Sequence, residues 1–196
     1  THGHSGVKRL LLGSIAAKVV QTAPGPLLLA RATEAPQAAE RASIQAVIVP
    51  LDGSEVAEIV LPLAFDVAKS VNAELVLARA FQVPPTAYYR TEDVPPVAEA
   101  FIPAYDDLVA DEIRQAQGYL GAKAKEAQSR GVTKLRTEVL NGSAAEEIVK
   151  LAQTTAGSLI AMCTHGRSGV RRLLLGSVTE KVVLRSHDPV LIVRAT

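Results

Sequence analysis

Short apolar segments rich in β-branched residues alternate with longer amphipathic segments from residue 44 onward, and this alternation strongly constrains the fold. The apolar segments, typical of buried strands, are 44–51, 75–81, 132–140, 159–163 and 189–193. Helical spacing of apolar residues marks 54–71, 106–129, 143–155 and the segment after Ser177. Because strand–helix–strand crossovers are right-handed, the pattern predicts an α/β fold: an open, doubly wound parallel sheet of five strands with helices on both faces.

The first 33 residues repeat the last 33. THGHSGVKRLLLGS at 1–14 reappears as THGRSGVRRLLLGS at 164–177, and the gapless match is identical at 20 of 33 positions. A repeat of this length predicts that residues 1–33 are the C-terminal end of a preceding homologous domain. The Ala- and Glu-rich segment 34–43 is then a linker, and 44–196 is a complete domain.

Composition limits the class of partner and the compartment. The 21 Lys and Arg residues nearly balance the 20 Asp and Glu residues, so the chain has no charge excess to drive nucleic-acid binding. A single cysteine cannot form an internal disulfide, which favours the reducing cytoplasm. No apolar run reaches the roughly 18 residues that span a bilayer, so no membrane association is predicted.

Two loops are expected to meet at one edge of the sheet. Ligands of open parallel sheets bind beyond the carboxyl ends of the strands where the strand order reverses, here between the first and fourth strands. Asp52 follows the first of these strands, and the glycine-containing loop 164–177 follows the fourth. The amides at the start of the last helix could hold an anion beside the hydroxyls of Ser177 and Thr179, and Asp52 could accept hydrogen bonds from a ribose or an adenine.

The same residues have simpler structural interpretations. Ser177 and Glu180 have the spacing of a capping box, and Asp52 in an Asp-Gly pair can bond its own backbone. No Cys/His ligand spacing surrounds His165, which favours a hydrogen-bonding loop residue over a metal ligand. Cys163 ends a buried strand and is interpreted as a small core residue.

Motifs in the complete domain resemble those of the universal stress protein family. They are VPLDGSE at 49–55, THGRSG at 164–169 and GSVTEKV at 176–182. The spacing of Gly166, nine residues and Gly176-Ser177 is far more specific than a lone glycine pattern. The resemblance covers 44–196. It implies an adenine nucleotide alpha hydrolase-like fold with strand order 3-2-1-4-5, and many members of this family bind ATP.

The resemblance therefore implies an ATP site, with or without Mg²⁺, and no catalytic residue. Residues at the ends of the strands would hold the adenosine, and the loop and the start of the last helix would hold the phosphates. The implied binding residues are Pro50, Leu51, Asp52, Ala80, Met162, Cys163, His165, Gly166, Arg167, Gly169, Gly176, Ser177, Val178 and Thr179. The family motif has a glycine where this chain has Cys163, which narrows the room for the ribose and phosphates.

Three functions are compatible with these residues. The first is a cytoplasmic regulatory protein in which ATP changes shape or partner choice. The second is a slow ATPase or phosphotransferase using Ser177 or Thr179, which is less favoured because the sequence offers no evident general base beside them. The third is an ATP-independent dimerising scaffold, favoured by Cys163.

The resemblance also implies pairing through the last strand, because family members dimerise there. The chain is accordingly expected to form a homodimer or an intrachain pseudo-dimer. In the latter, Leu27–Arg31 would pair antiparallel with Val190–Arg194.

Overall fold

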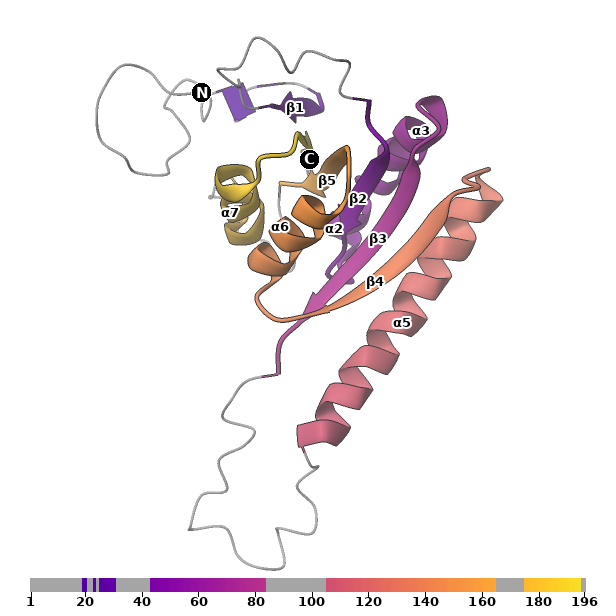
Figure 1. The fold of residues 1–196 in the computed structure, drawn as a ribbon, viewed down its shortest axis with the longest axis vertical. Helices are drawn as coiled ribbons and strands as arrows, with labels where there is room; N and C mark the ends of the chain where they lie inside the picture. Colours follow the sequence, from indigo (N-terminus) through magenta and orange to yellow (C-terminus); the bar gives the residue numbers. More distant parts are fainter. Residues whose placement is uncertain are drawn as a thin grey trace, which may run out of the picture.

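The computed structural model describes residues 19–20, 23, 25–30, 43–83, 105–164 and 175–194. Six strands in this part of the chain form one sheet with helices on both faces (Figure 1). The strands are β1 (Leu27–Leu29), β2 (Ala46–Pro50), β3 (Glu74–Phe81), β4 (Leu135–Asn141), β5 (Ser158–Cys163) and β6 (Val190–Val193). The helices are α2 (Glu55–Glu58), α3 (Leu61–Ser70), α5 (Tyr105–Ser129), α6 (Ala144–Thr154) and α7 (Ser177–Arg185). No helix among the described residues is long and apolar enough to cross a bilayer.

The sheet order is β4-β3-β2-β5-β6-β1, and every neighbouring pair is parallel except β6 and β1. The α/β class agrees with the sequence. The five parallel strands β2 to β6 have the expected order 3-2-1-4-5, and the sheet differs from the prediction in having β1, from the N-terminal repeat, as a sixth, antiparallel strand at its edge. Leu27–Leu29 pairs with Val190–Ile192, and Leu28 lies opposite Leu191. This confirms the expected antiparallel pairing over these residues. The domain limits and the linker remain predictions, and all of the predicted linker except Ser43 lies outside the described residues.

The core consists of two apolar layers separated by the sheet. Val47 and Val49 of β2 pack in the layer beneath α2, α3 and α5. Ala46 and Ile48 face the opposite way and pack beneath α6 and α7. Alternate side chains of a strand point to opposite faces, so a strand buried on both sides must be apolar throughout. β2 is such a strand.

The predicted helix over 54–71 is two helices. Ser54 caps α2, its hydroxyl accepting a hydrogen bond from the Ala57 amide at 3.2 Å. α2 ends at Glu58, and α3 begins at Leu61 with Pro62 in its first turn. Pro62 has no amide proton for the Glu58 carbonyl, so a continuous helix would lose a bond at this point.

The last helix begins differently from the prediction. Its N-cap is Gly176, whose carbonyl accepts the Glu180 amide at 2.9 Å, and Ser177 is the first helical residue. The predicted capping box of Ser177 and Glu180 is therefore wrong. The Gly176 amide donates to the Thr164 carbonyl at 2.5 Å, and this bond fixes the chain one residue before the predicted cap. At α6, Ser143 occupies the N-cap position without a side-chain hydrogen bond.

We predict that Ile48→Ala lowers the free energy of unfolding by about 2–5 kcal/mol, because Ile48 is 0% exposed and its replacement leaves a cavity in the central strand. Chemical denaturation measures the change. Ile59→Ala is the matched control, because Ile59 is 42% exposed and its loss should cost less than about 1 kcal/mol. Equal losses in the two variants would contradict the central place of β2 in the core.

Candidate functional site

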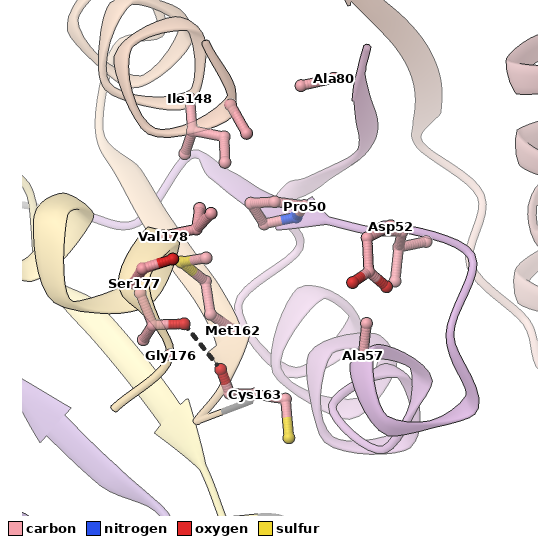
Figure 2. A pocket seen from close by; sticks show the side chains of 13 residues that line it. Pro50, Asp52, Ala57, Ala80, Ile148, Met162, Cys163, Gly176, Ser177 and Val178 are labelled. Carbon is pink, nitrogen blue, oxygen red and sulfur yellow. Dashed lines mark hydrogen bonds between the residues drawn. The ribbon is translucent and has the colours of Figure 1, made fainter. Parts of the chain in front are cut away.

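A cavity of about 270 Å³ lies at the carboxyl ends of β2, β3 and β5, beside the start of α7 (Figure 2). α2 and α6 supply the remaining walls. Its lining residues are Pro50, Leu51, Asp52, Ala57, Ala80, Ala144, Ile148, Met162, Cys163, Gly176, Ser177, Val178 and Thr179. β2 and β5 are neighbours in the sheet, and the helices that follow them, α2 and α7, pack on opposite faces of it. The cavity therefore occupies the position expected for a ligand in an open parallel sheet.

Ten of the fourteen residues implied by the sequence line this cavity. They are Pro50, Leu51, Asp52, Ala80, Met162, Cys163, Gly176, Ser177, Val178 and Thr179. The other four, His165, Gly166, Arg167 and Gly169, lie outside the described residues. Whether any of the fourteen binds a ligand stays a prediction.

Three lining residues were not anticipated from the sequence: Ala57, Ala144 and Ile148. Ala57 lies on α2, and the other two lie on the inner face of α6. The amphipathic pattern of 143–155 places Ile148 on a buried face, but it does not say that this face extends beyond the sheet edge. That information comes from the packing of α6 against the sheet.

Asp52 stands on the wall formed by the turn between β2 and α2. Its Oδ1 accepts two hydrogen bonds from Ser54, from the amide at 2.9 Å and from the hydroxyl at 2.6 Å. Gly53 between them has φ of 86°, a conformation that glycine adopts without strain. The local backbone role expected for Asp52 is therefore present. The same bonds hold its carboxylate at the cavity, on the wall opposite Ser177 (Figure 2).

The start of α7 forms the opposite wall. Helix geometry leaves the amides of Ser177, Val178 and Thr179 without acceptors within α7, and the helix dipole places partial positive charge there. Thr179 is buried, and its hydroxyl donates to the Cys163 carbonyl at 2.9 Å, the bond dashed in Figure 2. Its side chain thus joins α7 to the end of β5, while its amide belongs to the first turn of the helix.

Cys163 has both of the features that the sequence suggested separately. It is buried at 6% exposure, as a core residue would be, and it also lines the cavity. The described residues contain no group of three or more His, Cys, Asp or Glu side chains that could hold a metal ion.

The fold is that of an α/β protein with a cavity at the point where the strand order of its parallel sheet reverses. The profile of the universal stress protein family matches residues 43–194. Universal stress protein MJ0531 of Methanocaldococcus jannaschii is 35% identical over 148 residues, covering 76% of this chain and 81% of that protein. The chain belongs to the universal stress protein family.

Two solved structures are similar to this fold. The structure of protein MJ0577 has a TM-score of 0.61 at 26% identity, covering 79% of this chain and 98% of that one. A universal stress protein solved in complex with cAMP has a TM-score of 0.54 at 25% identity, covering 79% and 99%.

A longer relative matches the N-terminal repeat as well. Universal stress protein Rv2005c of Mycobacterium tuberculosis is 28% identical over 198 residues, covering 98% of this chain. The chain spans 59% of the length of that relative.

We predict that Thr179→Val lowers the free energy of unfolding by about 1–3 kcal/mol, because it leaves the buried Cys163 carbonyl without its donor. Thermal or chemical denaturation measures the loss. Thr154→Val is the matched control, because the Thr154 hydroxyl also bonds a backbone carbonyl, at 3.1 Å, but on the exposed surface where water can replace it. Similar stability in both variants would show that the α7–β5 bond contributes little.

Proposed function

We propose that this protein is a cytoplasmic ATP-binding regulatory protein, in which occupancy of the β2–β5 cavity changes its conformation or its choice of partner. The observation that carries the proposal is the convergence of ten residues implied by the family resemblance on one cavity. The cAMP complex of a similar structure supports an adenine nucleotide as the class of ligand.

The chemistry of the cavity suits the two halves of such a nucleotide. Ala80, Ile148 and Met162 offer an apolar space between β3, α6 and β5 for a flat base. The amides that begin α7 offer donors and positive potential for phosphates. Asp52 would accept hydrogen bonds from the ribose or the base. A nucleotide held largely by backbone groups needs no charge excess, which agrees with the net charge of +1.

The residues favour binding over catalysis. Asp52 is the only carboxylate that lines the cavity among the described residues, and it already accepts two hydrogen bonds from Ser54. The Thr179 hydroxyl donates to a carbonyl. An ATPase or phosphotransferase needs a base that orients its nucleophile, and no described side chain beside Ser177 is placed for that role. The alternative of an ATP-independent scaffold is supported only by Cys163, which stands where the family motif has a glycine.

The register of β1 on β6 supports an intrachain pseudo-dimer. In the repeat Leu28 corresponds to Leu191, and these two residues are direct partners. Leu27 corresponds to Val190 but pairs with Ile192, as a two-fold relation requires. The strand thus pairs with its own repeat about a local two-fold axis, the geometry of an isologous interface. We infer that the β6 edge is self-complementary and that β1 occupies the place of a second copy.

We predict that the wild-type chain binds ATP in a calorimetric titration and that Ala80→Phe weakens this binding about tenfold or more, because the ring fills the apolar part of the cavity. Ala122→Phe is the matched control: it makes the same change at an exposed position of α5 and should bind like the wild type. Absence of binding by the wild type, in titration and in thermal shift with ATP and Mg²⁺, would contradict the proposed function.

A second prediction concerns the pseudo-dimer. Leu27 and Leu29 pack against the core beneath α7, so replacing both with Asp should detach β1 and expose the β6 edge. Sedimentation velocity should then show a shift from the 20.7 kDa monomer to about twice that mass. Leu28→Asp is the control, because Leu28 is 58% exposed and its replacement should leave a monomer. A double variant that folds and stays monomeric would contradict self-complementarity.

A further inference from the structure

A polar cluster lies outside the cavity, between α2 and α5. We name it the Glu58 clamp and define it as Glu58 at the end of α2 with Tyr119 and Lys123 of α5. α5 runs along the β3–β4 side of the sheet (Figure 1), and none of its residues lines the cavity. Neither the family motifs nor the cavity accounts for this cluster.

Both carboxylate oxygens of Glu58 are engaged by α5. The Tyr119 hydroxyl donates to Oε1 at 2.8 Å, and the Lys123 ammonium donates to Oε2 at 2.5 Å. The side chains of Lys123 and Glu58 are only 19% and 25% exposed, so the pair is partly shielded from water. A pair of this kind holds its geometry better than an exposed ion pair.

The Tyr119 ring is held by cations. The Arg79 guanidinium of β3 lies 5.0 Å from the ring centroid, and the Lys123 ammonium lies 5.9 Å from it. Both distances are within the range of cation–π attraction. The ring therefore connects α5 to β3 one residue before Ala80, which lines the cavity.

The pKa shifts of the three groups favour the protonation states that their hydrogen bonds require: an ionised Glu58, a neutral Tyr119 and a protonated Lys123. Burial, followed by the hydrogen bond to Glu58, raises the pKa of the Tyr119 hydroxyl well above its usual range. The hydrogen bond to Glu58 raises the pKa of Lys123. Burial alone would raise the pKa of Glu58, but the bonds from Lys123 and Tyr119 outweigh it and lower that pKa. At neutral pH Glu58 is ionised, Lys123 is protonated and Tyr119 keeps its proton, so each group has the protonation state that its hydrogen bond requires.

α2 depends on such external contacts for its position. It has only four residues, too few to form a stable helix by itself. Its neighbouring turn carries Asp52, its own Ala57 lines the cavity, and Glu58 follows directly. The Asp52 carboxylate is also near enough to Tyr119 for its charge to contribute to the raised pKa of the hydroxyl. One wall of the site and the clamp are thus parts of the same short segment.

We propose that the Glu58 clamp is a positioning network for the Asp52 wall of the nucleotide site, so that α5 determines affinity for the adenosine part of the ligand without touching it. The proposal rests on the proposed function. Glu58, Tyr119 and Lys123 act through α2 and are positioning residues. The phosphate end of the site, at α7, lies on the opposite wall and does not depend on the clamp.

The test compares Glu58→Gln with Glu74→Gln. Glu74 is a matched control because it also accepts a bond from a distant basic residue, Arg136 at 3.1 Å, but at the opposite end of β3. Glu58→Gln should weaken binding of adenosine and of ATP by the same factor, about five- to tenfold, while affinity for inorganic triphosphate stays unchanged. Glu74→Gln should alter none of the three affinities. Tyr119→Phe, which removes one of the two bonds, should give a smaller loss in the same direction and serves if Glu58→Gln does not fold.

Hydrogen exchange without nucleotide gives an independent readout. Glu58→Gln should accelerate exchange of the amides in 55–60 while those of β2 stay protected. Clamp variants that lose stability but keep wild-type affinity for adenosine would overturn the proposal and leave a purely structural salt bridge. Failure of the wild type to bind adenosine or ATP would instead overturn the proposed function, and the proposal with it.

Discussion

Burial of β2 on both faces and along both edges is the constraint on which the rest of the structure depends. β2 pairs with β3 on one side and β5 on the other, and its Val47, Ile48 and Val49 are fully buried. Because β2 is parallel to both neighbours, the carboxyl ends of all three strands lie at the same edge of the sheet. The turn at Asp52 and the end of β5 at Cys163 consequently lie close together. The cavity forms beyond the ends of these two strands, because the helices that follow them, α2 and α7, pack on opposite faces of the sheet.

The site that results is made mostly of backbone and small side chains. Among the described residues, its polar groups include the carboxylate of Asp52, the hydroxyl of Ser177 and the amides of a helix whose first turn is fixed by the Gly176–Thr164 and Thr179–Cys163 bonds. Such a site is pre-organised by secondary structure, and its two walls are held by different contacts. The α7 wall is held by bonds to the β5 end. The α2 wall is held by the Glu58 clamp, which makes the long helix α5 part of the site's architecture.

Two of the periodic segments were predicted to within one residue at each end. The helix expected over 106–129 is observed as Tyr105–Ser129, and the strand expected over 159–163 is observed as Ser158–Cys163. The errors occur where a non-local contact or a single residue overrides periodicity. Pro62 divides the helix after β2 although the apolar spacing continues through it. The Gly176 amide bond to Thr164 moves the start of α7 by one position and removes the expected capping box.

The sequence by itself determined the alternation of strands and helices, the sheet edge at which Asp52 and Cys163 lie, and the repeat that relates β1 to β6. These features are local, because apolar periodicity and residue spacing are properties of short segments. Only the tertiary structure decided that Ala144 and Ile148 reach the cavity and that Glu58 meets α5. Glu58 is separated from its two partners by 61 and 65 residues. Contacts across such distances arise from the packing of whole elements, which no local pattern records.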